Sequence, residues 1–196
     1  MVSKFTTKIV EKKPLSENTF IFTLDCDKLE FKAGQFITFV MKDKEGKIKP
    51  RSYSIFNAPN HHPTQLLVEC VDGGVAGENF KAATPDTEFN VIGPIGKFYF
   101  QPEHHKHVFI ATNTGLTPFH SMIAQHLDED YDITLIFGGR TKDRLYFHEE
   151  FVALDKVDNT FTYKPTLSRE TVEGIAQGYV QKLIEFEEET QYYICG

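Results

Sequence analysis

Short runs in which apolar and polar residues alternate fill the chain up to about residue 100. These runs are rich in Phe, Ile, Thr and Val, and turn residues separate them at close spacing, a pattern typical of half-buried strands. They are KFTTKIV, TFIFTLDC, QFITFVMK, RSYSIF, QLLVECV and EFNVIG, with GENFKAA as one short helix. Many short strands in succession predict a sandwich or barrel for this half of the chain.

A different rhythm follows the segment QPEHHKH. The run HVFIAT is continuously apolar, as in a buried parallel strand, and PFHSMIAQHL has helical spacing with a proline near its start. The segments DITLIFGG, FHEEFVALD, FTYKPTLS, YVQKLIEF and QYYICG then alternate between strand and helix. This alternation predicts an α/β domain with a parallel sheet. We place the linker near Phe100 to His107, which gives two domains, 1–103 and 104–196.

Composition narrows the class of protein. The chain has 196 residues, 40% of them hydrophobic and 25% charged, so it has the composition of a folded globular protein and not of a disordered one. A formal net charge of −7 argues against nucleic acid or an anionic membrane as the main partner. No apolar run approaches the length of a membrane span, and the start MVSKFTTKIV has no signal pattern, so we expect retention in the cytoplasm.

Neither the cysteines nor the histidines have metal-ligand spacing. Cys26, Cys70 and Cys195 lie far apart and are odd in number, which suits free thiols in a reducing compartment. The histidines of HHP and HHKH have no nearby cysteine or acidic partner at ligand spacing. We therefore expect no metal site and treat these histidines as solvated loop residues.

The stretch RSYSIFNAP places an arginine, a tyrosine and two hydroxyls on one predicted strand. The planar guanidinium of Arg51 suits a phosphate, the ring of Tyr53 can stack on a flat cofactor, and Ser52 and Ser54 offer hydroxyl groups. Strand alternation puts Arg51 and Tyr53 on one face and Ser54 on the other. An edge strand with one solvated face is the alternative interpretation.

Two glycine-containing turns could bind a ligand. In DGGVAGENF the residues Gly74, Val75, Ala76 and Gly77 lead into a short helix, whose first backbone amides can bind an anion. A plain glycine-rich turn is equally compatible with that sequence. In FIATNTGLTPFHSM the turn with Thr114, Gly115 and Thr117 follows a buried strand, where ligands of doubly wound sheets bind.

Arginine and hydroxyl side chains follow the later strands. FGGR ends one strand with Arg140, TLSRE ends the next with Ser168 and Arg169, and YYICG ends the last with Cys195. Arginines and hydroxyls at neighbouring strand ends can bind a phosphorylated ribose. A helix-capping serine beside a solvated arginine is the alternative for Ser168 and Arg169.

The order of these motifs resembles the ferredoxin–NADP reductase family. RSYS, GGVAG, GPIGKF, TNTGLTP, FGGR, LSRE with GYV, and a final CG occur in family order from about residue 5 to the last residue. The resemblance implies an antiparallel flavin-binding β-barrel followed by a doubly wound parallel α/β domain that binds NAD(P). It implies FAD as the prosthetic group and NADPH, or alternatively NADH, as the electron donor.

The resemblance also assigns roles to residues of the first half. Arg51 resembles the residue that contacts the FAD pyrophosphate, and Tyr53 the residue that packs on the isoalloxazine. Ser54 resembles the residue near flavin N5, which makes it a catalytic candidate. Residues 74–77 resemble the stretch that closes on the pyrophosphate.

In the second half, the turn at Thr114 and Gly115 resembles the turn beside the nicotinamide and pyrophosphate. Ser168 and Arg169 resemble the pair that contacts the 2′-phosphate of NADPH, assisted by Arg140. Cys195 resembles the cysteine beside the site of hydride transfer and is the second catalytic candidate.

The chain departs from the family pattern at three places. Gly77 stands where many relatives have serine or threonine, and Asn113 stands where relatives have glycine; asparagine tolerates a left-handed backbone better than most residues. Relatives continue CG into a proline and a methionine-containing helix, whereas this sequence ends at Gly196. We therefore expect a nucleotide-binding domain that is short at its C-terminus.

The resemblance implies an NAD(P)H-dependent flavoprotein reductase in which hydride passes to flavin N5. The expected acceptor is a redox partner protein: a ferredoxin, a flavodoxin or an oxygenase component. Three alternatives stay open: an electron-transfer subunit active only in a complex, a free-flavin reductase, and a flavin- or NAD(P)-binding module without turnover. The sequence does not identify the acceptor or the oligomeric state.

Overall fold

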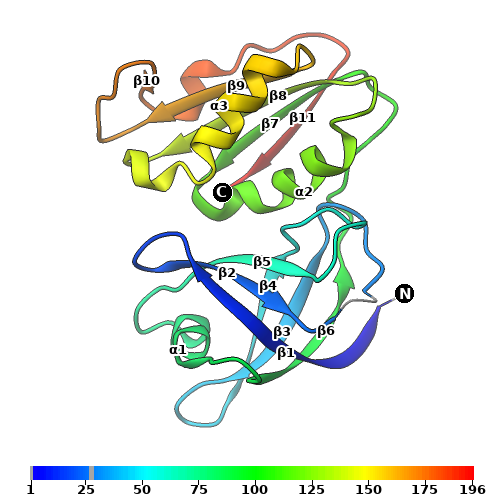
Figure 1. Cartoon of the computed structure of the whole chain (residues 1–196), viewed down its shortest axis with the longest axis vertical. Coiled ribbons are helices and arrows are strands. Elements are labelled where there is room, and N and C mark those ends of the chain that lie inside the picture. Colours follow the sequence, from blue (N-terminus) through cyan, green and yellow to red (C-terminus); the bar gives the residue numbers. More distant parts are fainter. Residues whose placement is uncertain (1, 27–28) are drawn as a thin grey trace. The chain divides into compact units, whose positions relative to one another are not determined.

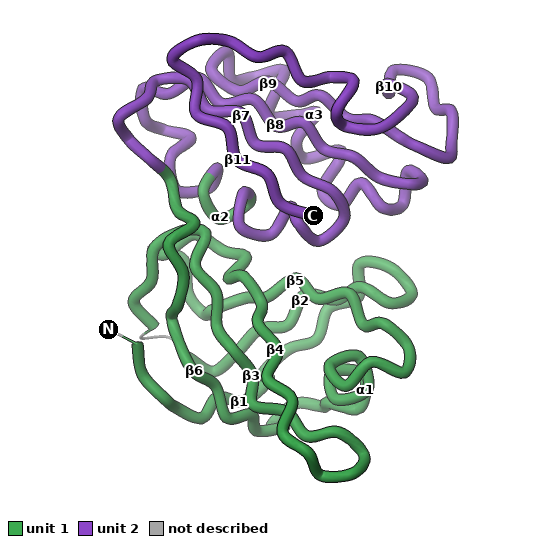
Figure 2. Tube along the Cα trace, turned by 180° about the vertical axis from the view of Figure 1, so that it is seen from behind, with its two compact units in different colours: residues 1–100, 120–122 green, residues 101–119, 123–196 purple. Residues whose placement is uncertain are grey.

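The chain forms two compact units in a computed structural model that describes residues 2–26 and 29–196. Unit 1 comprises residues 1–100 together with 120–122, and unit 2 comprises residues 101–119 and 123–196 (Figure 2). Each unit has its own sheet, and the two sheets differ in strand direction.

Unit 1 is built on a six-stranded sheet in which every pairing is antiparallel. Its strand order is β4-β3-β6-β1-β2-β5. The first and last strands of this order meet at a bridge between Ile55 and Leu66, so the sheet curls into a half-barrel (Figure 1). The elements are β1 (Ser3–Pro14), β2 (Thr19–Leu24), β3 (Phe36–Lys42), β4 (Ile48–Ser54), β5 (Gln65–Glu69), α1 (Val75–Ala82) and β6 (Glu88–Ile95).

Phenylalanine side chains fill the inside of the curled sheet. Phe80 of helix α1 is fully buried and lies 4.8 Å from Phe22 and 5.1 Å from Phe39, measured between ring centroids. Phe39 also meets Phe89 edge-on at 5.3 Å. Aromatic pairs in such geometry stabilise a fold by more than the burial of their surface alone. These phenylalanine contacts therefore hold α1 on the sheet.

Unit 2 has a five-stranded parallel sheet with the order β10-β9-β8-β7-β11. Along the chain, a helix lies between β7 and β8 and another between β8 and β9, as the alternating sequence pattern predicts. The elements are β7 (Lys106–Thr112), η1 (Asn113–Gly115), α2 (Leu116–His126), β8 (Asp132–Gly139), η2 (Lys142–Arg144), α3 (His148–Val157), β9 (Phe161–Leu167), β10 (Ala176–Gln177), η3 (Val180–Leu183) and β11 (Thr190–Cys195).

The segment YVQKLIEF forms only the short 3₁₀ turn η3, and not the helix that the alternation predicted. Val180 packs with Ile110 and Ile136 of the sheet, and Leu183 and Ile184 lie against the same cluster. The chain beyond them has glutamates at positions 185, 187, 188 and 189, which would repel one another along a helix at spacings of three and four. Apolar packing therefore fixes the first turn, and like charges oppose its continuation.

A buried histidine anchors the start of unit 2. The Nε2–H of His107 donates to the carbonyl of His104 at 2.9 Å, and the Tyr193 hydroxyl lies 3.4 Å from its Nδ1. The same hydroxyl accepts the backbone N–H of Gln101 at 2.9 Å. Burial lowers the pKa of His107 to about 4, so the ring is neutral near pH 7 and Nδ1 accepts the tyrosine hydrogen.

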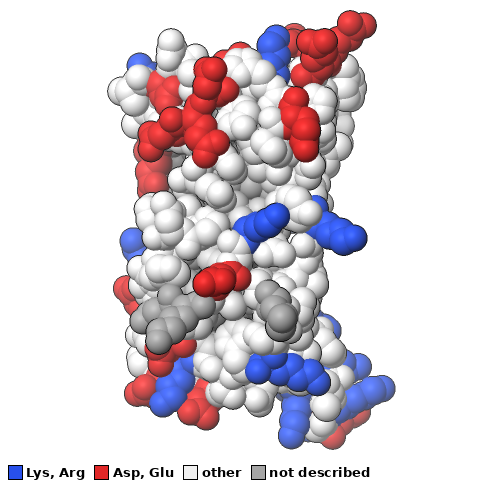
Figure 3. Space-filling view, turned by 90° about the vertical axis from the view of Figure 1, so that its right-hand side faces the viewer, with Lys and Arg blue, Asp and Glu red and all other residues white. Residues whose placement is uncertain are grey.

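The acidic charge of the chain is concentrated in the second half. Acidic residues outnumber Lys and Arg two to one in residues 101–196, whereas the two are nearly balanced in residues 1–100. On the face drawn in Figure 3, Asp and Glu gather over unit 2, whereas Lys and Arg over unit 1 have acidic residues among them. A phosphate bound to unit 2 must therefore be held by local cations and not by the overall field. None of the helices in the described part of the chain is long and apolar enough to cross a membrane.

Candidate functional site

Strand β4 presents the RSYS side chains on two faces. Arg51 pairs with Phe39 and Tyr53 with Ile37 across the antiparallel ladder, so both point to the face of these buried residues. Ser52 is on the opposite face, where its hydroxyl lies 2.9 Å from that of Thr38. β4 is also an end strand of the sheet order, so one of its backbone edges is open apart from the bridge at Ile55.

Tyr53 is held in place by aromatic rings. Its ring is half-buried and meets Phe80 edge-on at 5.2 Å and Phe39 at 6.0 Å. Burial raises the pKa of Tyr53 to about 12, so the hydroxyl stays protonated at physiological pH. Since Phe80 belongs to α1, this contact also fixes the strand that carries Arg51 relative to that helix.

Arg51 and Ser54 keep their polar groups available. The Arg51 guanidinium is exposed and donates to the carbonyl of Pro50 at 2.8 Å. Within the described residues, no carboxylate lies within 4.0 Å of this guanidinium, and the half-buried Ser54 hydroxyl has no protein partner. The arginine can therefore bind an anion, and the serine can donate its hydrogen to a ligand.

Helix α1 begins without a side-chain cap. It starts at Val75 after Gly73 and Gly74, and Gly74 makes no capping hydrogen bond to the first backbone amides. A cavity of about 260 Å³ opens beside this first turn, and its wall includes Gly73, Val75 and Lys44 as well as the acidic residues Asp43, Glu45 and Glu78. The Glu78 carboxylate accepts the backbone N–H of Gly73 at 3.3 Å, which leaves the amides of residues 75–77 for a ligand. Uncapped amides at a helix start bind anions well, because their N–H groups and the helix dipole act together.

The structure explains why Gly77 lacks the expected hydroxyl side chain. A Cβ atom added to Gly77 would lie 2.9 Å from the carbonyl carbon of Val71 and 3.0 Å from its amide nitrogen, and closer still to its carbonyl oxygen. The first turn of α1 packs so closely on the preceding loop that only glycine fits. The departure from the family pattern therefore has a steric cause within this chain.

The second candidate site lies where strands β7, β8 and β9 end. A cavity of about 180 Å³ at these carboxyl ends is lined by Thr112, Asn113, Gly138, Gly139, Arg140, Ser168, Gly178, Tyr179, Val180 and Gln181. It brings together Arg140 and Ser168, two of the residues predicted to bind the nucleotide. Carboxyl ends of parallel strands are the usual place for nucleotides in such sheets.

The turn after β7 is built for close approach of the backbone. Asn113 adopts a left-handed φ of 49°, which confirms that asparagine can take this position. A Cβ atom on Gly115 would lie 2.6 Å from the Cα of Gly196 and closer to the Cys195 carbonyl, so the turn touches the end of β11. The Thr117 hydroxyl donates to the Thr114 carbonyl at 2.6 Å, so its hydrogen is used within the turn.

Cys195 and Arg169 lie near this edge of the sheet without lining the cavity. Burial raises the pKa of the Cys195 thiol, so the group is a thiol and not a thiolate at neutral pH. The backbone N–H of Arg169 donates to the Arg140 carbonyl at 2.9 Å, while its side chain is exposed. The two arginines therefore occupy neighbouring positions at the ends of β8 and β9.

Tyr179 and Gln181 line the same cavity but were absent from the predicted set. The Tyr179 ring is 69% exposed, an unusual position for a large aromatic side chain, and it can stack on a base. The signal in the sequence is the tripeptide GYV, where an aromatic residue follows a glycine shortly after the LSRE segment.

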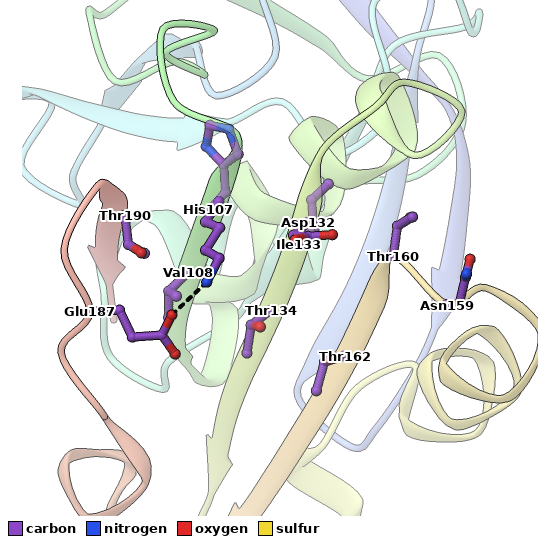
Figure 4. A pocket seen from close by; sticks show the side chains of 11 residues that line it. His107, Val108, Asp132, Ile133, Thr134, Asn159, Thr160, Thr162, Glu187 and Thr190 are labelled. Carbon is purple, nitrogen blue, oxygen red and sulfur yellow. Dashed lines mark hydrogen bonds and ion pairs between the residues drawn. The ribbon is translucent and has the colours of Figure 1, made fainter.

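A larger cavity of about 290 Å³ in unit 2 lies at the opposite ends of the strands (Figure 4). Lys106 in its wall forms an ion pair with Glu187 at 2.8 Å (Figure 4), and Asp132 lies 3.6 Å from the ring of His105, which is outside the wall. Hydroxyls of Thr134 and Thr162 complete much of the wall. Without an unpaired cation this cavity offers little to a phosphate, so we assign the nucleotide to the carboxyl-end cavity.

Comparison with known proteins defines the class. Residues 6–100 match the family described as "Oxidoreductase FAD-binding domain", and residues 109–196 match the "Oxidoreductase NAD-binding domain". The chain thus consists of a FAD-binding and an NAD-binding oxidoreductase domain. It belongs to the ferredoxin–NADP reductase family of NAD(P)H-dependent flavoprotein oxidoreductases.

Two relatives show how far the similarity extends. "Ferredoxin--NADP reductase B" of Sorangium cellulosum is 31% identical over 174 residues, covering 84% of this chain and 70% of the relative. The "2-halobenzoate 1,2-dioxygenase electron transfer component" of Burkholderia cepacia is 28% identical, covering 99% of this chain and 60% of its own length. The chain therefore spans only part of these relatives.

Solved structures confirm the fold. A ferredoxin NADP+ reductase from Neisseria gonorrhoeae with bound FAD and NADP has a TM-score of 0.82 at 18% identity, covering 97% of this chain and 84% of the other. The cytochrome b5 reductase domain of Ulva prolifera nitrate reductase has a TM-score of 0.83 at 22% identity, covering 99% and 87%. The predicted fold class, an antiparallel barrel followed by a parallel α/β domain, is confirmed.

Proposed function

We propose that this chain is a reductase that takes hydride from NADPH onto FAD and passes the electrons to a redox partner protein. The observation that carries the proposal is the contact of Phe80, in the second half of α1, with Tyr53 on the strand that also carries Arg51 and Ser54, together with the uncapped start of the same helix. An unpaired arginine, free helix amides and an anchored aromatic ring suit the diphosphate and the flat ring of a flavin dinucleotide.

The residues present fit FAD. The flavin supplies the hydride acceptor and releases electrons singly or in pairs to the next carrier. Arg51 and the amides of residues 74–77 would hold the diphosphate, and the anchored Tyr53 ring would face the flavin ring. Ser54 would donate its hydroxyl hydrogen to a ring nitrogen, and this donor is not otherwise used.

The nucleotide would lie at the carboxyl ends of β7, β8 and β9. Arg140 and Ser168 would bind a phosphorylated ribose, with Arg169 as a second cation next to Arg140 in the backbone ladder. Tyr179 would stack on the base. The turn at Thr114 and Gly115, which touches the end of β11, would hold the nicotinamide half, and Cys195 would lie beside it as a neutral thiol.

The preference for NADPH rests on charge. Two neighbouring arginines, in a unit whose net charge is negative, make the local site selective for a ribose that carries a 2′-phosphate. An Arg169→Ala variant should lower kcat/KM for NADPH and leave kcat/KM for NADH nearly unchanged. If the variant and the wild type have the same ratio of kcat/KM for NADPH over kcat/KM for NADH, Arg169 does not contact the 2′-phosphate.

The identity of the acceptor separates two candidate functions. The relatives named as electron transfer components of dioxygenases support an oxygenase component as the partner. The relative named as a ferredoxin–NADP reductase supports a ferredoxin or flavodoxin. Stopped-flow reoxidation of NADPH-reduced protein by each purified carrier decides between them, with ferricyanide as the control acceptor.

Cofactor content tests the proposal first. Purified protein should carry FAD in near-stoichiometric amount, identified by chromatography of the heat-released flavin. Protein that carries no flavin, but turns over added riboflavin or FMN with NADPH, would be a free-flavin reductase. Protein that keeps FAD but does not oxidise NADPH with any acceptor would be a binding module.

A further inference from the structure

The loop between β9 and η3 leaves the sheet and returns to the same strand. It begins at Ser168, at the end of β9, and the short strand β10 comes back to pair with β9 in parallel, with Ala176 opposite Thr166 and Gln177 opposite Leu167. The backbone N–H of Gly178 closes the loop by donating to the Leu167 carbonyl at 2.8 Å. Figure 1 shows β10 at the end of the sheet beside β9.

A threonine side chain joins the two ends of this loop. The Thr166 hydroxyl lies 3.1 Å from the Ala176 carbonyl and 2.9 Å from the Gly178 carbonyl. Its single hydrogen is shared between the two acceptors, a common three-centre arrangement. Thr166 is only 1% exposed, so water does not compete for this hydrogen.

The ends that Thr166 joins are those that carry the nucleotide-binding side chains. Ser168 follows Thr166 by two residues on the outgoing chain, and Tyr179 follows Gly178 directly on the returning chain. Both line the carboxyl-end cavity. A strand of two residues gives little restraint by itself, so the Thr166 hydroxyl adds to the restraint that the Gly178 N–H and the buried Val180 give to Tyr179 between them.

We propose that Thr166 is a positioning residue for nucleotide binding, which holds the Ser168–Gly178 loop closed so that Ser168 and Tyr179 face one cavity. The inference rests on the proposed function, because it concerns the adenosine half of NADPH. Among the described residues the hydroxyl donates only to the carbonyls of Ala176 and Gly178, so it acts through Tyr179 and Ser168.

This role predicts a split between binding and catalysis. Thr166→Val keeps the branched shape of the side chain and replaces the hydroxyl by a methyl group, which cannot donate to the two carbonyls. KM for NADPH should rise about fivefold, the usual effect of losing one hydrogen bond, while kcat stays within a factor of about two. Reduced nicotinamide mononucleotide lacks the adenosine half, so its kcat/KM should be the same in variant and wild type.

Two further variants make the test specific. Thr166→Ser restores the hydroxyl and should return KM for NADPH to near the wild-type value. Thr162→Val, the same substitution at an exposed position of the same strand, should change neither substrate's kinetics. If Thr166→Val does not fold, the same kinetic constants are measured for Thr166→Ala, which also lacks the hydroxyl and has a smaller side chain.

The outcomes separate this inference from the proposed function. Wild-type protein that reduces its flavin with NADPH, together with an unchanged KM in Thr166→Val, overturns the positioning role alone. An equal loss with NADPH and the mononucleotide also overturns it, because it shows a general structural defect. Wild-type protein that does not oxidise NADPH overturns both.

Discussion

Replacing Gly77 with alanine tests how closely the start of helix α1 must pack on the loop before it. The new methyl group would lie 2.9 Å from the carbonyl carbon of Val71 and 3.0 Å from its amide nitrogen. Both are backbone atoms and cannot turn away as a flexible side chain would. The first turn of α1 therefore has to move, and its free amides move with it.

Two opposing contributions set the size of the effect. Overpacking in a well-packed region costs about 1–3 kcal/mol, and a backbone obstruction belongs at the upper end. Alanine in place of glycine within a helix gains about 1 kcal/mol. The free energy of unfolding should therefore fall by about 2 kcal/mol, although helix propensity alone predicts an increase.

Urea unfolding of apo protein and titration with FAD measure the two consequences separately. Gly77→Ala should lower the free energy of unfolding and weaken FAD binding. The control is Ala82→Gly, an exposed change in the same helix, which should cost up to about 1 kcal/mol through propensity and leave FAD affinity unchanged. A Gly77→Ala protein as stable as wild type with unchanged FAD affinity would refute the steric argument.

Three other predictions concern charge and protonation. Arg51→Ala should weaken FAD binding about 10- to 100-fold, because a charge-assisted hydrogen bond to a phosphate is lost; unchanged affinity in a fluorescence titration would contradict this role. Arg169→Ala should reduce the ratio of kcat/KM for NADPH over NADH, measured at constant ionic strength. Folding lowers the pKa of His107 from 6.5 to about 4. As the pH drops below 6.5, this histidine therefore takes up a proton in the unfolded chain before it does so in the folded protein, and the free energy of unfolding falls until the pH is near 4. His107→Gln should flatten this fall in urea titrations at pH 5 and pH 7.5; an unchanged slope would show that His107 does not contribute to it.

Strong periodicity made most of the fold predictable from sequence. The largely apolar segment DITLIFGG matches β8 at both ends, and its residues 135–139 are all buried, as in a strand covered on both faces. Segment 179–186 shows the limit of this reasoning. Its apolar spacing suits a helix, but the sheet contact of Val180 and the repulsion among four glutamates allow only one turn.

Site residues that directly follow a predicted strand could be found from the sequence. Site residues whose position depends on a strand pairing were missed. Arg140 and Ser168 end adjacent parallel strands, so sequence order brings them to one cavity. Tyr179 reaches the same cavity only because β10 returns to β9, a pairing of two residues that has no sequence pattern of its own. The close approach of Gly77 to Val71 likewise depends on how the intervening turn folds.

The visible spectrum of purified protein, recorded anaerobically before and after addition of NADPH, is the most direct test of flavin binding and reduction. We expect a yellow protein whose flavin bands bleach on addition of NADPH, which would demonstrate bound flavin and hydride transfer together. A colourless protein that also fails to bind added FAD would contradict the role given to Arg51, Tyr53 and Ser54. Flavin bands that persist with NADPH would contradict the nucleotide site at the ends of β7, β8 and β9.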